Sequence, residues 1–131
     1  MLKIQQIIKN RLLHESNIQL CILYGSAAKD RLTERSDIDI AVSGYNTFDL
    51  HYLVHLQSSL SLLLEREVDL VDMNRAEGLI LQHILKGEVL IKKDAAVYAD
   101  FIRKVIYFNA DILPNIRMIL KIRARRFVRG Y

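Results

Sequence analysis

Asp37 and Asp39 stand two positions apart in a run rich in isoleucine, and together they could hold a divalent cation. Successive side chains of a strand point to opposite faces, so both carboxylates project the same way, roughly 6.6 Å apart along the backbone. At an effective dielectric constant near 20, two such carboxylates repel each other by about 2 to 4 kcal/mol. A bound cation offsets that repulsion, and Mg²⁺ fits because it takes one or two carboxylates together with phosphate oxygens of a substrate.

A glycine–serine pair precedes these aspartates and is suited to binding a phosphate. Residues 18–24 are rich in β-branched and apolar side chains, which predicts a buried strand that ends at Gly25. Gly25 lets the backbone come close to a phosphate, and Ser26 supplies a hydroxyl donor and a helix N-cap. A short helix over 26–31 would present its free N–H groups to a polyphosphate. Either motif alone is usually a plain turn or a solvated strand face, but the two together predict a magnesium nucleotide site.

The spacing of the two motifs resembles that of the minimal nucleotidyltransferases of the polymerase β superfamily. Their signature is Gly-Ser, ten residues, then Asp-x-Asp, and residues 27–36 are the ten intervening positions. The resemblance covers about residues 18–92 and implies a third carboxylate on a later strand. Within 67–72, strand alternation favours Asp69, and Asp72 is the weaker choice because it falls at the end of the strand.

The chain departs from the family pattern just after the serine. Many relatives carry arginine and then glycine there, whereas this chain has Lys29 and Asp30. Lys29 keeps a positive charge that could reach a phosphate, but lysine cannot make the bidentate contact of arginine. The departure concerns the detail of nucleotide contact and leaves the class of chemistry unchanged.

The activity that the resemblance implies is transfer of AMP from ATP to a hydroxyl, with two Mg²⁺ ions. Asp37 and Asp39 would hold Mg²⁺ against the triphosphate. Asp69 would share the second ion and help to deprotonate the hydroxyl. Gly25 and Ser26 would keep the β and γ phosphates in line for attack.

Small free-standing members of this kind resemble the antitoxins of HEPN–MNT toxin–antitoxin pairs. The resemblance implies a protein partner, a HEPN ribonuclease toxin, and transfer of AMP to one of its tyrosines, which would silence it. Two alternatives remain open. One is an antitoxin that only covers its toxin, and the other is a nucleotidyltransferase of the aminoglycoside type that modifies a small molecule.

The elements that must position these residues alternate between helix and strand. This alternation predicts an α/β (α+β) fold with a small mixed sheet and packed helices, as in polymerase β-like nucleotidyltransferases. The apolar spacing over 48–66 predicts that Leu53, Leu56, Leu60, Leu63 and Leu64 face the core. Pro114 is expected to break the last helical pattern. Strands are predicted over 18–24, 37–43, 67–72 and 88–92, the last at an edge, and helices over 2–14, 26–31, 48–66, 76–86, 95–112 and 115–128.

Composition favours one small cytoplasmic domain over 1–131. The resemblance implies a catalytic core at about 18–92, followed by a helical extension at about 95–131. The single cysteine, Cys21, is expected to be a small core residue rather than a nucleophile. The N-terminal segment is too polar for a signal peptide, and no run approaches transmembrane length. All four histidines are expected to be ordinary helix-face or surface residues, including His51 and His55, whose spacing could otherwise bind zinc.

The net charge of +4 comes from the end of the chain. Residues 1–111 carry 13 basic and 15 acidic side chains, whereas six basic and no acidic side chains follow Asp111. An apolar side of Ile116, Ile119, Leu120 and Phe127 lies beside these bases. The tail could pack this side on the body, contact a nucleotide phosphate, or bind an acidic partner. Direct nucleic-acid binding is possible but not favoured.

Overall fold

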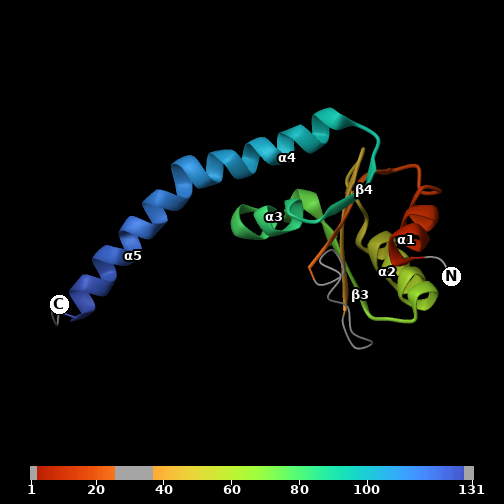
Figure 1. Ribbon diagram of the computed structural model, residues 1–131, viewed down its shortest axis with the longest axis horizontal. Coiled ribbons are helices and arrows are strands. Elements are labelled where there is room, and N and C mark those ends of the chain that lie inside the picture. The colour runs from red at the N-terminus through yellow and green to blue at the C-terminus, as the bar shows by residue number, and fades with distance from the viewer. Residues whose placement is uncertain (1–2, 26–36, 129–131) are drawn as a thin grey trace.

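The computed structural model describes residues 3–25 and 37–128, which form a four-stranded sheet with helices on both faces (Figure 1). The mixed sheet with packed helices is thus confirmed. The elements, in chain order, are α1 (Ile4–Leu12), β1 (Ile18–Tyr24), β2 (Ile38–Gly44), α2 (Leu50–Leu64), β3 (Val68–Asp72), the 3₁₀ turn η2 (Met73–Arg75), α3 (Gly78–Leu85), β4 (Glu88–Lys92), α4 (Ala95–Tyr107), the π-helical turn η3 (Phe108–Ile112) and α5 (Leu113–Val128).

The strands lie in the order β3-β2-β1-β4. β1 pairs antiparallel with both β2 and β4, and β2 pairs parallel with β3. Every β1 residue is buried, which explains why this strand reads as one apolar run without alternation. β4 lies at an edge of the sheet, as expected, and both of its end residues are exposed.

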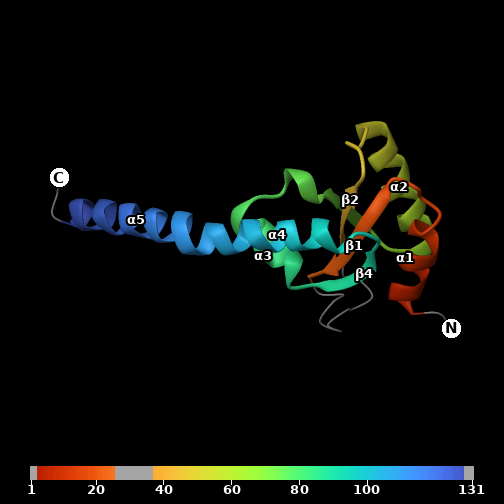
Figure 2. The same ribbon diagram turned by 90° about the horizontal axis from the view of Figure 1, so that it is seen from above.

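Each face of the sheet has its own helices and its own core (Figure 2). Leu23, Ile38 and Ile40 pack with α1 and α2 on one face. On the other face, Tyr24 and Ala41 pack with residues of α3 and α4. Neighbouring residues of β1 and β2 therefore enter opposite cores, and this alternation fixes which face each aspartate shares.

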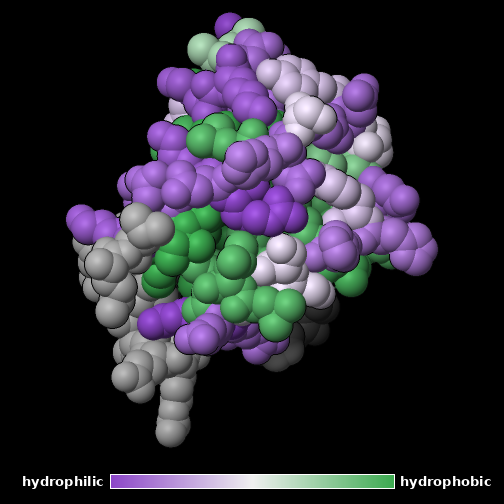
Figure 3. Space-filling view, turned by 90° about the vertical axis from the view of Figure 1, so that its right-hand side faces the viewer, coloured by the Kyte–Doolittle hydropathy of each residue, from purple (hydrophilic) through white to green (hydrophobic). Residues whose placement is uncertain are grey.

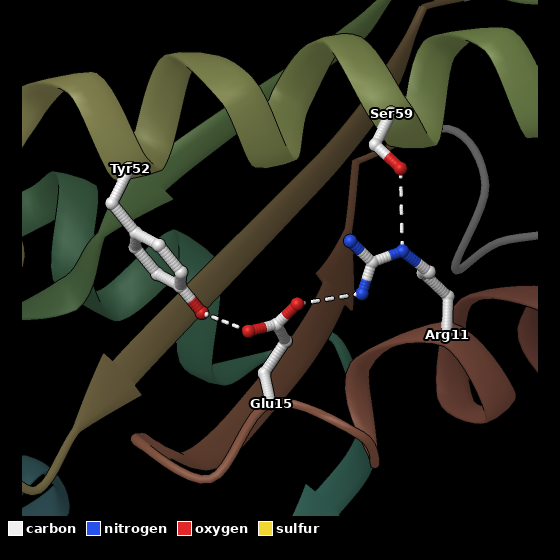
Figure 4. Close-up of polar contacts among 4 residues, drawn as sticks. All are labelled: Arg11, Glu15, Tyr52 and Ser59. Carbon is white, nitrogen blue, oxygen red and sulfur yellow. Dashed lines mark hydrogen bonds and ion pairs between the residues drawn. The ribbon is translucent and has the colours of Figure 1, made fainter.

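α1 and α2 are tied together by a small polar network (Figure 4). The Arg11 guanidinium donates to Glu15 at 2.7 Å and to the Ser59 hydroxyl at 3.2 Å. The Tyr52 hydroxyl donates to the other Glu15 oxygen at 2.8 Å. The hydrogen bond from Arg11 is the main reason that the pKa of Glu15 lies below its usual value. The network fixes α2 against α1 on the face of the sheet opposite α3 and α4.

α4, η3 and α5 form one unbroken helical rod that leaves the body of the protein (Figures 1 and 2). Phe101, 3% exposed, anchors α4 in the core. The expected break at Pro114 is wrong, because the helix continues through it. Proline has no N–H to donate to the carbonyl of Ala110, and the π-helical turn directly before it absorbs this mismatch.

The apolar residues of α2 are only partly in the core. Leu56 and Leu60 are buried, and Leu53 and Leu64 pack at its margin. Leu63 is 51% exposed, so its predicted core position is wrong. Figure 3 shows hydrophilic side chains over much of the face that it views, with hydrophobic side chains gathered mainly below its middle. The predicted helix over 26–31 lies outside the described residues.

The remaining composition-based expectations concern single residues. Cys21 is buried in the core, as expected, and burial raises the pKa of its thiol to about 12. His51 and His55 are exposed on α2. Over the ranges 3–25 and 37–128, no helix is long and apolar enough to cross a membrane.

Candidate active site

Asp39 and Asp69 lie at directly paired positions of the parallel strands β2 and β3. Adjacent strands are about 4.8 Å apart, so the two aspartates are next to each other across the sheet. The residues on either side of each aspartate are buried under α1 and α2. By alternation, both carboxylates therefore stand on the other face, beyond the part of it that α3 and α4 cover.

Asp37 precedes β2 and has the same parity as Asp39. Its charge acts on Asp39, which is consistent with a position on the same face. Asp72 is different, because it is only 7% exposed and its side chain accepts a hydrogen bond from the Asn74 N–H at 3.0 Å, capping the turn η2. Of the two candidates in 67–72, only Asp69 joins the other aspartates.

Burial and the charges of this group act on Asp39 in the same direction. Burial raises the pKa of the Asp39 carboxyl most, and the charges of Asp69 and Asp37 raise it further. His83 acts in the opposite direction. A carboxylate that is partly desolvated and repelled by two others gains stability from any cation bound between them.

Gly25 makes room for Asp39. Its φ is +71°, in the left-handed region that favours glycine, and a Cβ there would lie 2.5 Å from Asp39 Oδ2. The end of β1 thus comes as close to the aspartate as a side-chain-free backbone allows. Glycine is needed at position 25 because any side chain there would collide with the Asp39 carboxylate. The sequence motif alone does not reveal this reason.

Tyr24 and His83 also belong to the site, and the sequence did not identify either of them. Tyr24 is paired with Asp39 across β1 and β2. Its ring meets the His83 ring edge-on at 5.7 Å. Burial raises the pKa of the Tyr24 hydroxyl to about 12, and the charges of Asp39 and Asp69 add to this effect. His83 was expected only as a helix-face residue, because the packing of α3 against Tyr24 depends on residues far apart in the chain and cannot be predicted from local sequence.

The donor chemistry fits a hard divalent cation. Asp37, Asp39 and Asp69 offer carboxylate oxygens on one open sheet face, and a cation would relieve the repulsion at Asp39. Within the described ranges, no three His, Cys, Asp or Glu side chains are already gathered closely enough to hold a metal ion. The aspartates therefore fit a cation whose remaining ligands are substrate phosphate oxygens or water. Ser26 and Lys29, the other predicted nucleotide contacts, lie outside the described residues.

Known proteins resemble this chain in sequence and in fold. A family model described as polymerase beta, nucleotidyltransferase matches residues 3–96. A putative protein adenylyltransferase of Methanocaldococcus jannaschii is 38% identical over 66 residues, which cover 50% of this chain and 67% of the relative. The protein adenylyltransferase MntA of Shewanella oneidensis is 31% identical over 86 residues, and the match spans 62% of each protein.

Solved structures extend the likeness to nearly the whole chain. A toxin–antitoxin crystal structure with AMP-PNP contains a chain with a TM-score of 0.67 and 26% identity, and the match covers 95% of this chain and 93% of that one. A structure of the tri-AMPylated Shewanella oneidensis HEPN toxin with MNT antitoxin gives a TM-score of 0.58 at 25% identity, with 95% and 93% covered. With its paired aspartates and its glycine turn on this fold, the chain belongs to the polymerase β nucleotidyltransferase family.

Proposed function

We propose that this protein is an antitoxin that transfers AMP from ATP to a tyrosine hydroxyl of a HEPN ribonuclease toxin and so neutralises it. The observation that carries the proposal is the pairing of Asp39 with Asp69 beside Gly25 in a nucleotidyltransferase fold. The matched relatives are named as protein adenylyltransferases, and one matched complex holds an AMPylated HEPN toxin. The proposal includes a single domain located in the cytoplasm. The buried cysteine is free, which accords with a compartment that keeps thiols reduced.

In this proposal, the residues of the site divide the work between nucleotide and acceptor. Asp37 and Asp39 hold the nucleotide with its magnesium, and Asp69 accepts the proton of the attacking hydroxyl. Gly25, Ser26 and Lys29 hold the β and γ phosphates so that the hydroxyl attacks the α phosphate in line. Bound Mg²⁺, two ions in this proposal, supplies charge neutralisation at the attacked phosphate and on the leaving pyrophosphate.

The test is label transfer from ATP carrying ³²P at the α phosphate to a co-encoded HEPN protein. We expect label on the toxin with the wild-type chain and Mg²⁺, and loss of label by at least 100-fold with EDTA, Asp39→Asn or Asp69→Asn. Asp72→Asn is the matched control. It changes a carboxylate on the same strand that faces away from the site, and asparagine still accepts the capping hydrogen bond.

Two outcomes would overturn the proposal. If the wild-type chain silences the toxin without labelling it, and Asp39→Asn silences it equally well, the protein acts by binding alone. If label appears on an aminoglycoside in the absence of the toxin, and never on the toxin, the acceptor is a small molecule.

A further inference from the structure

α5 exposes aliphatic side chains along its length, far from the core of the protein (Figures 1 and 2). Ile116, Ile119 and Leu120 are 41%, 48% and 57% exposed. The alternative in which the tail packs this side on the body is therefore wrong for the described residues. The side chain of Phe127, the fourth expected member, lies outside them.

The exposed residues share one face with Ile112 at the end of η3. The spacings from Ile112 to Ile116, Ile119 and Leu120 are four, seven and eight residues, which place all four on one side of a helix. We call these four residues the apolar stripe. It begins at a cavity of about 440 Å³ between the start of α3 and η3, where Phe108 and Ile112 contribute apolar walls and Lys104 and Glu77 contribute charged ones.

The cavity at the base of the stripe is shaped by Gly78. This residue has a φ of +59°, and a Cβ there would lie 3.1 Å from the Phe108 ring. Glycine therefore lets α3 start close against η3 and keeps Phe108 in the cavity wall. The stripe and the cavity form one continuous surface that crosses from the body of the protein onto the rod.

The charges around the stripe select its partner. The basic side chains of α5 are all exposed, and no acidic residue lies in the helix; they are Arg117, Lys121, Arg123, Arg125 and Arg126. Pairing with α5 of a second copy would place these cations against each other. A nucleic acid would satisfy the charges but would leave the aliphatic stripe in water. A protein face that carries apolar side chains bordered by carboxylates satisfies both.

We propose that the apolar stripe and the cavity at its base are the surface that docks the toxin, through a toxin face of apolar side chains bordered by carboxylates. The identity of the partner rests on the proposed function. The matched chain of a toxin–antitoxin complex aligns with 95% of this one, so it has a counterpart of most of the 16-residue α5 and is found together with a toxin partner. Residues 114–126 of this long helix are all exposed, and such a helix gains stability from what it binds.

The test is the affinity for a co-encoded HEPN protein, measured by titration calorimetry. All variants carry Asp39→Asn, so that AMP transfer does not change the toxin during the measurement. We expect Ile116→Asp with Ile119→Asp to weaken binding by at least 100-fold, and Ile116→Ala with Ile119→Ala, which keeps the helix, by at least 10-fold. Arg117→Glu with Lys121→Glu should weaken binding at low salt, with a smaller effect at high salt.

The matched control is Leu62→Asp, which adds the same charge at an aliphatic residue that is 81% exposed on α2. It should bind as the parent does. Parental affinity in both stripe variants would overturn the proposal. The proposal would also be overturned if the stripe variants bound the toxin normally but lost a homodimer that the parent forms in sedimentation. The same holds if they bound the toxin normally but lost binding to a labelled single-stranded RNA. Because affinity is measured without catalysis, a failure of AMP transfer in the wild-type chain would overturn the proposed function and leave the docking surface standing.

Discussion

At the scale of single residues, Asp39 links the candidate site to the stability of the fold. Its pKa is raised by burial and by two neighbouring carboxylates, so the folded chain holds its charge less favourably than the unfolded chain does. The resulting loss of folding stability is fully present when the pH lies above the pKa that Asp39 has in the folded protein. It is relieved as the pH falls and the carboxyl takes up its proton.

Replacement of this charge should therefore stabilise the metal-free protein. We expect Asp39→Asn to unfold at a higher temperature than the wild type at pH 7 in EDTA, because the amide carries no charge to be repelled. The gap should narrow as the pH falls through the range in which Asp39 protonates. Circular dichroism melts over a pH series check this, with Asp72→Asn as the control. A wild type that melts above Asp39→Asn at pH 7 would contradict the electrostatic argument.

Gly25 offers a second prediction at this scale. Gly25→Ala combines a left-handed φ with a Cβ 2.5 Å from Asp39 Oδ2, so we expect a loss of about 1 to 3 kcal/mol in unfolding free energy. AMP transfer should fall at least 10-fold, because the carboxylate must move. Gly44→Ala, whose Cβ would lie 2.8 Å from the Asn46 carbonyl oxygen and from the Phe48 ring and away from the aspartates, should lose stability and keep transfer. Urea unfolding and label transfer separate the two effects.

The shared face of Asp37 and Asp39 was predictable because a strand has a strict period of two, whereas a third aspartate was expected from the family resemblance. Once Ile38 and Ile40 were assigned to the core, Asp37 and Asp39 had to share the other face, and the structure pairs Asp39 with Asp69. His83 was not predictable in this way. Its place beside Tyr24 depends on how α3 packs against β1, which involves residues far apart in the chain.

At the scale of elements, strands were easier to predict than helix faces. β1 and β4 begin and end at the predicted residues, because turn and charged residues bound two apolar runs. The apolar spacing of α2 placed Leu53, Leu56, Leu60 and Leu64 correctly. It failed only at Leu63, which stands in a run of three leucines over 62–64 and is 51% exposed. The predicted helix break at Pro114 was wrong for a different reason. A π-helical turn can carry a proline through a helix, and this depends on backbone geometry that residue type alone does not specify.

The two kinds of leucine in α2 give a matched prediction. Leu60 is fully buried between the helix and the sheet, so Leu60→Ala should lower the unfolding free energy by about 2 to 5 kcal/mol. Leu62, 81% exposed on the same helix, should lose less than about 0.5 kcal/mol when changed to alanine. Urea unfolding at pH 7 measures both. Equal losses would mean that α2 is rotated from the orientation described here.

At the scale of the whole molecule, the chain separates a body that holds the three aspartates from a basic rod. Residues 1–111 have more acidic than basic side chains, and the six bases that follow account for the net positive charge. The described bases of α5 are exposed, and the helix that carries them extends away from the sheet that holds the aspartates (Figure 1). The separation keeps strong positive charge at a distance from the carboxylates and leaves it free for a partner.

This separation predicts two very different local stabilities in one chain. β1 is buried between two cores, so its amides should exchange with solvent only through global unfolding. Residues 114–126 of α5 are all exposed, and the helix is near the length at which an isolated helix is marginal, so its amides should show protection factors below about 10. Hydrogen exchange read by mass spectrometry measures both, and addition of a co-encoded HEPN protein should slow exchange in α5. Exchange in free α5 as slow as in β1 would show that the rod is already packed in the free protein.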